Sequence, residues 1–569
     1  MKNSKGFTNL KIAELLRDVA SGYQFKGEKE NKFKIVAYQR AADAVEHATS
    51  ELKDLWDDGK LSDVPGIGPS IAGHLDDLFK NGSSKHFKEV LSGIPQEAFK
   101  LMTLPGIGIK TAMKLIQEGD KDELEAKLKE AEMLSKKERR QLLPYASVIA
   151  AEIVNYMLVN KSVKKVEPLG SLRRKSATVG DIDLAAATTD PIETLNHFAK
   201  YPKAVKVIEK GEHSSSILLA GNIQVDIIAQ KPDTFGSLLQ HFTGSKHHNV
   251  ALREYSLKKG LSLSEKGIKK VGSDEIKHFE TEESFYNYLG LDWIEPELRE
   301  DGGEILAALN HKLPKLIELK DIKGDLQMHS DYDIETSHDV GASSMEALVK
   351  KGNELGYEYL AFTEHNPSKM KHIDKDFVEI LKRKRERVDK INYSISNSKT
   401  GSIKKVFNSL EIDINVNGTL PVPNEALETL DFALVSVHGS FRLSKDEMTK
   451  RVLSALSVPK VKVFAHPTAR KIQEREGIDL DWEKIFEFCL KNNKFIEINC
   501  DPARLDLPDS LVREAVKLGV KLTLGTDAHH VDGLNNMIWG ISVARRGWAT
   551  KNDIINSLSL KQFEEVISK

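Results

Sequence analysis

Three aspartates lie in short apolar runs, at a spacing that suits metal-dependent chemistry. Asp181 and Asp183 belong to the run VGDIDLAA, and Asp226 belongs to IQVDIIA. Because side chains of a strand alternate between its two faces, Asp181 and Asp183 would share one face, about 6 to 7 Å apart. Carboxylates this close repel each other unless cations intervene, and their hard oxygens favour Mg²⁺. The triad predicts a two-metal site for in-line displacement at phosphorus; the alternative is a set of surface aspartates at strand ends.

The C-terminal half holds a second collection of candidate ligands. A single histidine at a strand end is more often a hydrogen-bonded packing residue than a ligand, but so many together predict a shared site. Imidazole and carboxylate together suit Zn²⁺ or Mn²⁺, and a bridging Glu411 would hold two ions close enough to polarise a phosphate. The segments are GDLQMHS (324–330), SHD (337–339), TEH (363–365), LEID (410–413), SVHGS (436–440), AHPTAR (465–470) and GTDAHH (525–530).

Two near copies of one glycine turn occur in the N-terminal region, VPGIGPSIA at 64–72 and LPGIGIKTA at 104–112. Such a turn exposes backbone N–H groups ahead of a helix and can hold a phosphate. One copy alone could be a plain corner between helices. Two copies resemble helix–hairpin–helix motifs, which grip DNA phosphates without reading sequence, through Gly66, Gly68, Gly106 and Gly108, with Lys110 adding charge.

The surrounding elements change in character along the chain. Residues 10–134 form short helical segments with alternating charge, whereas β-rich runs follow residue 161. From about Asp321, short apolar strands alternate with amphipathic helices and end in His, Glu or Asp. Chemistry at the carboxyl ends of parallel strands predicts a barrel-like α/β domain behind an α+β region.

Length and composition set outer limits. A chain of 569 residues exceeds what one hydrophobic core normally holds, so several domains are expected. With 40% hydrophobic and 30% charged residues the chain reads as soluble and globular, with no membrane span or secretory signal. Its only cysteines, Cys489 and Cys500, form no close metal or redox spacing, which indicates a reducing cytoplasm. The net charge of −2 announces no nucleic-acid partner by itself.

The string GSLRRKSATVGDID (170–183) resembles, without a gap, the nucleotidyltransferase signature of family X DNA polymerases, the DNA polymerase beta-like enzymes. A second string, HFTGSKHHNVALR (241–253), resembles that family's nucleotide-sugar and minor-groove segment. The resemblance covers roughly residues 1 to 318. It implies that Asp181, Asp183 and Asp226 hold the catalytic metals, that Gly170, Ser171, Arg174 and Gly180 bind the triphosphate, that His241, Phe242, Gly244 and Asn249 meet the sugar and base, and that Arg253 meets the template.

The chain departs from the family pattern at several places. His241 stands where the family usually has Tyr, which predicts altered exclusion of ribonucleotides. Gln224 stands where DNA polymerase beta has Arg beside the third aspartate, so another group is expected to orient Asp226. His74 and Ser70 replace lysines of the lyase domain, and because amine attack needs a Lys there, no lyase activity is predicted.

The C-terminal motifs follow the order of the polymerase and histidinol phosphatase (PHP) domain, which they resemble. The resemblance implies one ion held by His329, Glu411 and Asp527, a second by Glu411, His438 and His466, and a third by His365, His529 and either His338 or Asp339. Gln327 replaces the first His of the usual H-x-H, and because an amide offers only a neutral oxygen or a hydrogen bond, weaker metal binding is expected there. Glu364 is not expected to be a ligand.

These resemblances imply a multidomain α+β and α/β protein with a helical helix–hairpin–helix N-terminal region, a nucleotidyltransferase-type palm, a thumb-like subdomain and a distorted PHP α/β barrel. The expected bounds are 1–90 and 91–145 for two helix–hairpin–helix regions, 146–235 for the palm, 236–318 for the thumb-like nucleotide-selection subdomain with its linker, and 319–569 for the PHP domain.

The implied function is filling of short gaps in base excision repair, joined to 3′-5′ exonuclease or related 3′-end phosphoesterase work. Mg²⁺ or Mn²⁺ would serve the palm, Zn²⁺ or Mn²⁺ the PHP domain, and a monovalent cation the helix–hairpin–helix turns. Gapped or nicked DNA and deoxynucleoside triphosphates are the expected partners of a monomer in the nucleoid. The alternatives are a PHP domain that is only structural or regulatory, and template-independent nucleotidyl transfer.

Overall fold

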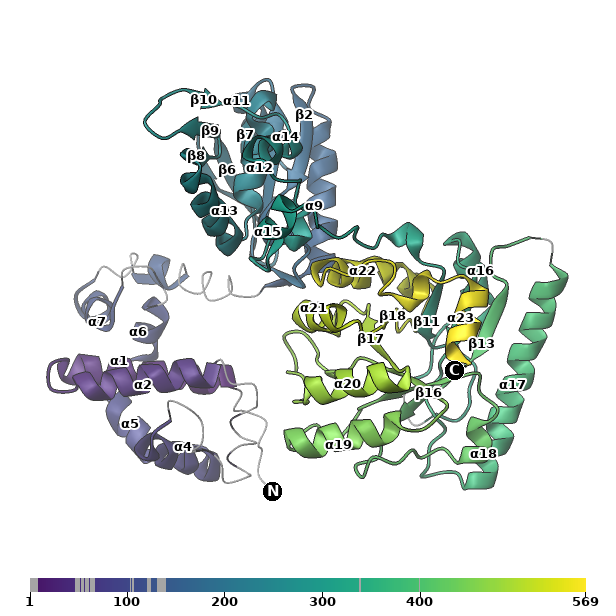
Figure 1. Cartoon of the computed structure of the whole chain (residues 1–569). Coiled ribbons are helices and arrows are strands. Elements are labelled where there is room, and N and C mark those ends of the chain that lie inside the picture. Colours follow the sequence, from purple (N-terminus) through teal and green to yellow (C-terminus); the bar gives the residue numbers. More distant parts are fainter. Residues whose placement is uncertain are drawn as a thin grey trace. The chain divides into compact units, whose positions relative to one another are not determined.

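The computed structural model describes residues 9–46, 52, 56, 61, 67–102, 104, 107–119, 124–129, 140–336, 339–398 and 400–568 (Figure 1). The chain divides into two compact units, Met1–Arg139 and Arg140–Lys569. Among the described helices, none is long and apolar enough to cross a membrane.

The first unit is helical and has two small cores. Ile12, Leu16 and Leu75 belong to the first core, whereas Leu101, Ile109 and Ala112 belong to the second. Gly68 and Gly108 sit in extended conformation directly before the two helices that follow the repeated turns. The helices are α1 (Asn9–Gly27), α2 (Lys32–Glu46), α4 (Pro69–Asn81), α5 (Lys85–Leu91), α6 (Gln96–Leu101) and α7 (Ile109–Glu118).

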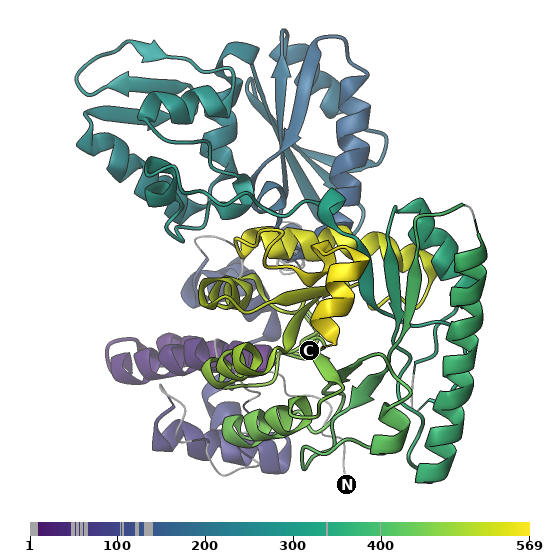
Figure 2. The same cartoon turned by 45° about the vertical axis from the view of Figure 1, so that its right-hand side comes forward.

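The second unit opens with a five-stranded sheet, here called the palm sheet, in the strand order β2-β4-β7-β6-β5. Its central pair β4 and β7 is parallel, whereas the other neighbours are antiparallel. Helix α9 lies beside the strands (Figure 2). The elements are β1 (Gln141–Leu142), α9 (Leu143–Leu158), β2 (Val163–Pro168), α10 (Gly170–Arg173), β3 (Thr178–Val179), β4 (Ile182–Thr188), α11 (Pro191–Phe198), β5 (Ala204–Lys210), β6 (Ser214–Leu219) and β7 (Ile223–Gln230).

A mixed segment follows the palm sheet and has its own core around Leu252, Phe285 and Leu298. Glu282 forms two buried ion pairs: the pair with Arg173 (2.7 Å) fixes the segment to α10, and the pair with the fully buried Arg299 (2.6 Å) lies within the segment. Its elements are α12 (Phe235–Thr243), α13 (Lys246–Lys258), β8 (Leu261–Ser264), β9 (Gly267–Lys270), β10 (Ile276–Lys277), α14 (Glu282–Leu289) and α15 (Glu304–Leu309).

The remaining strands form a distorted parallel barrel, in two sheets of order β11-β12-β13 and β14-β15-β16-β17-β18. Isolated bridges join the sheets at His365↔Glu411 and Met328↔Ala528, so the ring is completed without a continuous ladder. The strands are β11 (Gly324–Met328), β12 (Tyr359–Phe362), β13 (Lys405–Asn408), β14 (Glu411–Asp413), β15 (Ala433–Ser436), β16 (Val461–Phe464), β17 (Phe495–Asn499) and β18 (Leu522–Gly525). The predicted fold class is confirmed.

Helices surround the barrel, with α19 to α22 in a row on one side and α16 to α18 on the other (Figures 1 and 2). The last helix packs across the interior, where the ring of Phe563 stacks on Tyr359 with centroids 4.8 Å apart. The helices are α16 (Met345–Glu354), α17 (Asp374–Asn397), α18 (Asn424–Leu427), α19 (Lys445–Leu456), α20 (Trp482–Asn492), α21 (Asp509–Leu518), α22 (Met537–Arg546) and α23 (Leu560–Ile567).

Candidate active sites

The palm sheet brings the three aspartates together. Asp183 on β4 and Asp226 on β7 are register partners of a parallel pair, and Asp181 lies just before β4. The neighbouring residues Ile182 and Val225 are fully buried, so strand alternation leaves the carboxylates on the more open face. The triad is not among the groups of described residues whose ligand atoms all lie within 4.8 Å of one another.

Electrostatics confirm that the aspartates interact. Burial and, to a smaller extent, the negative charges of Asp226 and Asp181 together raise the pKa of the Asp183 carboxyl to about 7. A cation between them would remove this repulsion, so the set fits a divalent metal. Gln224 donates from its amide to both carboxylate oxygens of Asp226, at 3.0 and 2.9 Å. The expectation that a residue other than the one at 224 orients Asp226 is therefore wrong.

The turn at α10 lies directly against this carboxylate set. Gly170 has φ +53°, and a β-carbon there would lie 3.0 Å from Oδ2 of Asp183. The backbone N–H of Leu169 donates to the Asp183 carbonyl at 2.8 Å. Glycine is required at 170 both by the left-handed conformation and by the close approach. The turn therefore packs its backbone closely against Asp183.

Arg174 ends the turn and links it to the Gly244 segment. Its Nη1 donates to the carbonyl of Thr243 at 2.6 Å, and its Nε donates to Glu300 at 2.8 Å. Gly244 has φ +70°, and a β-carbon there would lie 3.2 Å from Arg174 Nη1. Arg174 thus connects the turn that begins at Gly170 with the segment at Gly244, and the nucleotide contacts of these residues stay a prediction.

The predicted sugar and base contacts lie at the junction of α12 and α13. The amide of Asn249 donates to the His241 carbonyl at 2.7 Å and accepts from Gln240 at 2.9 Å. The ring of Phe242, 37% exposed, lies 4.8 Å from that of His241. Burial and the charge of Arg253 lower the pKa of His241, which favours the neutral ring. Ser171 lies on the turn at α10, Gly180 lies just before β4, and Arg253 is exposed on α13.

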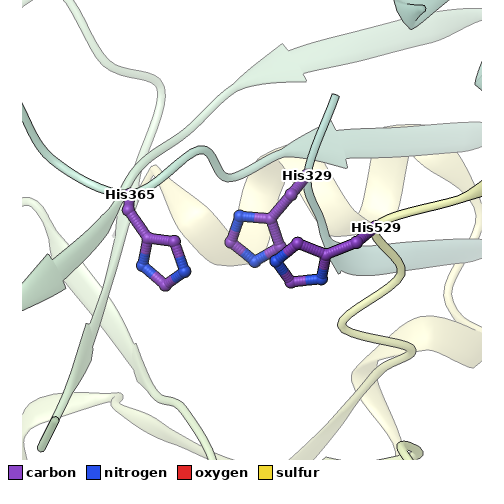
Figure 3. Close-up of side chains that lie close together, drawn as sticks. All are labelled: His329, His365 and His529. Carbon is purple, nitrogen blue, oxygen red and sulfur yellow. The ribbon is translucent and has the colours of Figure 1, made fainter. Parts of the chain in front are cut away.

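The barrel brings a second set of ligands together at the carboxyl ends of its strands. His329 follows β11, His365 follows β12, and His529 follows β18. Their rings gather in one place, with the centroid of His329 4.5 Å from His365 and 4.3 Å from His529 (Figure 3). Ligand atoms within 4.8 Å of one another form the groups His329–His365–His529, His365–Glu411–His438 and His329–Glu411–Asp527.

Glu411 is the centre of this site. Its Oε1 lies 2.8 Å from His466 Nε2 and 3.3 Å from His438 Nε2. Its Oε2 lies 3.3 Å from His329 Nε2, which in turn lies 3.1 Å from Asp527 Oδ1. A buried carboxylate shared by three imidazoles is suited to bridging two cations.

The unmet polar atoms of the site match a metal centre. His529 Nε2 is buried and has no hydrogen-bond partner among the described residues. Burial alone would lower the pKa of His329, but Asp527 and Glu411 outweigh it and raise the pKa to about 10. The protein's own carboxylates therefore attract a positive charge at this point, and a divalent ion would supply it.

Among the described residues, the predicted ligands Asp339 and His466 belong to none of these groups, although His466 lies 2.8 Å from Glu411. Asp339 is exposed and belongs to none of them, whereas His338 lies outside the described residues. His329 takes the place in the third group that was assigned to either of them. Gln327 is buried and donates to Glu411 Oε2 at 2.8 Å, so it orients the bridging carboxylate.

Sequence reasoning missed several supporting residues. Asp413 accepts from His438 Nδ1 at 2.6 Å, and strand alternation after Glu411 could have found it. Lys384 is fully buried and pairs with Glu364 at 2.6 Å. Lys384 lies at helical spacing from the buried Leu381 and Val388, a signal that the charged sequence around it hides.

The N-terminal turns are described only in part. Gly66 and Gly106 lie outside the described residues, and Gly68 and Gly108 precede helices with space around them. Lys110 lies 3.4 Å from Glu28. His74 stacks on His86 at 3.9 Å, and burial lowers the pKa of both rings.

The palm sheet carries three aspartates with a glycine–arginine turn beside them, and the helical unit carries the repeated glycine motif. These features together define the class of the protein: a nucleotidyltransferase that acts on nucleic acid. The family model described as DNA polymerase beta thumb matches residues 238–300, and the family model described as Helix-hairpin-helix domain matches residues 7–84. A DNA polymerase/3′-5′ exonuclease PolX from Bacillus subtilis (strain 168) is 32% identical, over 98% of this chain and 99% of that protein. The chain belongs to the PolX-like family X DNA polymerases, as the sequence predicts.

Two further relatives match parts of the chain. DNA polymerase lambda from Rattus norvegicus is 24% identical over 51% of this chain and 56% of its own length. A probable phosphatase from Acetivibrio thermocellus is 27% identical over 33% of this chain and 73% of its own length.

Proposed function

We propose that the chain fills short gaps in DNA during base excision repair and removes nucleotides from 3′ ends. The observation that carries the proposal is the presence in one chain of two separate ligand sets, Asp181, Asp183 and Asp226 on the palm sheet and the Glu411 set in the barrel. The PolX relative, whose name gives both activities, matches this chain over nearly its whole length and supports the presence of both activities in one protein.

The palm residues would carry nucleotidyl transfer. Mg²⁺ bound there would lower the pKa of the primer 3′-hydroxyl and neutralise charge on the triphosphate. Asp181, Asp183 and Asp226 would hold the ions. Backbone N–H groups of Gly170 and Ser171 and the guanidinium of Arg174 would hold the triphosphate, and Asn249 and Arg253 would meet base and template.

The barrel residues would carry hydrolysis of a 3′-terminal phosphodiester. Zn²⁺ or Mn²⁺ held there would polarise the phosphate and supply hydroxide. Glu411 would bridge two ions, and Asp413 would fix the orientation of His438 by its hydrogen bond. Buried Gln327 would orient Glu411 through its amide N–H and offer its neutral Oε1 as a weak ligand, and Glu364 would support the site without acting as a ligand.

The repeated turns in residues 1–145 would grip gapped or nicked DNA, with a monovalent cation at each turn. Residues 146–235 would form the palm, 236–318 the nucleotide-selecting thumb and linker, and 319–569 the PHP domain. We place the chain in the cytoplasm with the nucleoid, working as a monomer. His74 offers no amine, so abasic-site lyase chemistry is not part of the proposal.

Two substitutions test the proposal in one pair of assays. Asp183→Ala should abolish filling of a one-nucleotide gap and leave exonuclease activity within about twofold, because the two sites share no ligand. Asp527→Ala should do the reverse. Synthesis by Asp183→Ala would refute the palm assignment, and unchanged exonuclease activity in Asp527→Ala would make the barrel a structural module.

A further inference from the structure

The nucleotide turn is tied to the barrel by a pair of consecutive ion pairs. Glu300 Oε1 accepts from Arg174 Nε at 2.8 Å and from Arg546 Nη1 at 2.9 Å. Arg546 is the last residue of α22, and it also donates to the backbone carbonyl of Arg174 at 2.8 Å. A barrel residue therefore contacts both the main chain of Arg174 and the carboxylate that holds its side chain.

The contact is well enclosed. The side chains of Arg546 and Arg174 are 11% and 14% exposed, and Glu300 is 35% exposed. Arg546 is itself fixed by Asp509 at 2.7 Å. Trp548, just beyond α22, is buried in the core around Leu298, and Arg513 lies 3.7 Å from its ring. Arg546 is thus held rigidly from the barrel side.

The two arginines of the turn have different supports. Arg173 pairs with Glu282, which pairs with Arg299, so its chain of charges stays within the segment beside the palm sheet. Arg174 pairs with Glu300, and the next member of that chain is Arg546 of the barrel. Of these two series of ion pairs, the one from Arg174 through Glu300 to Arg546 leads from a proposed triphosphate contact to the barrel.

We propose that Arg546 is a positioning residue for nucleotide binding, which places the guanidinium of Arg174 through Glu300 and through the Arg174 carbonyl. This inference rests on the proposed function, because it takes Arg174 as a triphosphate contact. Without Arg546, the Glu300 carboxylate is no longer fixed from the barrel side, so the Arg174 guanidinium that it binds can take other orientations. The hydrogen bond from Arg546 to the Arg174 carbonyl is also lost. The barrel then contributes to synthesis through the fixed charge of Arg546, in addition to its own hydrolytic activity.

Steady-state gap filling by the full-length protein tests the inference. Arg546→Gln should raise the KM for the incoming deoxynucleotide about 5- to 20-fold and change kcat by less than about twofold. The double variant Arg546→Gln with Glu300→Gln should have about the KM of the worse single variant, since the two residues act as one unit. An unchanged KM in Arg546→Gln, or additive effects in the double variant, would overturn the inference.

Arg545→Gln is the matched control. Arg545 precedes Arg546 and pairs with Glu297 at 2.8 Å and Glu295 at 3.3 Å, whereas Arg174 pairs with Glu300. Arg545→Gln should leave the KM for the incoming deoxynucleotide unchanged. An equal rise of that KM in Arg545→Gln and Arg546→Gln would show that the effect comes from loosened packing between the barrel and the palm, and would overturn the inference. Exonuclease activity measured on the same samples should be unchanged in both variants and reports that the barrel is folded.

Arg174→Gln separates this inference from the proposed function. A rise in KM with Arg174→Gln but not with Arg546→Gln overturns only the role of Arg546. An unchanged KM with Arg174→Gln would refute the triphosphate assignment itself.

Discussion

Glutamine stands in both sites where a charged or ligating residue would be the usual choice, and the structure gives each one a definite task. Gln224 donates to both oxygens of Asp226, and Gln327 donates to Oε2 of Glu411. An amide orients a carboxylate without neutralising it, so both acids keep their full charge for a cation. The residue types at 224 and 327 were readable from the sequence, but their hydrogen bonds depended on the register of neighbouring strands.

Gln327→His should strengthen metal binding in the barrel. An imidazole at this buried position adds a ligand next to His329 and Glu411, and we expect the dissociation constant for Mn²⁺ to fall about tenfold. Competition with a chelator of known affinity measures it. Gln327→Leu removes the hydrogen bond and adds no ligand, so it should not tighten binding; equal affinities for the histidine variant and the native protein would contradict the expectation.

His241→Tyr should sharpen the preference for deoxynucleotides. The phenol is bulkier than the imidazole that it replaces beside Phe242, and we expect the ratio of kcat/KM for deoxy- over ribonucleotide to rise about tenfold. Because burial and Arg253 lower the pKa of His241, the neutral ring is favoured over the imidazolium, and the native ratio should change little as the pH rises above neutrality. A ratio that is unmoved by the substitution would remove residue 241 from sugar selection.

At the level of the elements, the order of motifs allowed the barrel to be predicted, because each ligand follows a short apolar strand. The strand pairing that completes the ring was not predictable in the same way. His365↔Glu411 and Met328↔Ala528 are isolated bridges, and no local pattern in the sequence marks them. Lys384 shows a second limit, since α17 carries many charges and only the spacing of its buried residues places one lysine inside.

Glu282→Gln tests how strongly one buried carboxylate fixes the elements around the nucleotide turn. Burial works against ionisation, but Arg299 and Arg173 outweigh it and lower the pKa of Glu282 to about 2. The substitution leaves two arginines short of a charge partner, and we expect the free energy of unfolding at pH 7 to fall by about 3 kcal/mol. Urea unfolding followed by a probe in this unit measures the loss.

The pH dependence of that loss has a definite sign. The folded pKa is depressed, so the stabilisation is present above the ordinary pKa of 4.5 and is lost as the pH falls toward about 2. The difference between native and variant protein should therefore narrow from pH 5 to pH 3. A constant difference over that range would show that packing, rather than charge, accounts for it.

At the scale of the whole molecule, the division at residue 139 separates the repeated glycine turns from both metal sites. A protein of residues 140–569 should keep exonuclease activity on single-stranded 3′ ends. It should bind gapped duplex more weakly, with a shallower dependence of log affinity on log salt, because it has lost phosphate contacts. Binding measured at several salt concentrations decides the matter, and an unchanged affinity and slope would place the DNA grip elsewhere.

The closure of the barrel sets the order in which the chain can acquire its activities during synthesis. The palm sheet is complete once β7 has been made, so its carboxylates can meet early. His329 and Asp527 are separated by 198 residues, and Met328 must wait for Ala528 before the ring can close. Contacts so distant in sequence form slowly, and the N-terminal parts of a nascent chain fold first. A newly made molecule would therefore bring its palm carboxylates together before it assembles the ligands of the barrel.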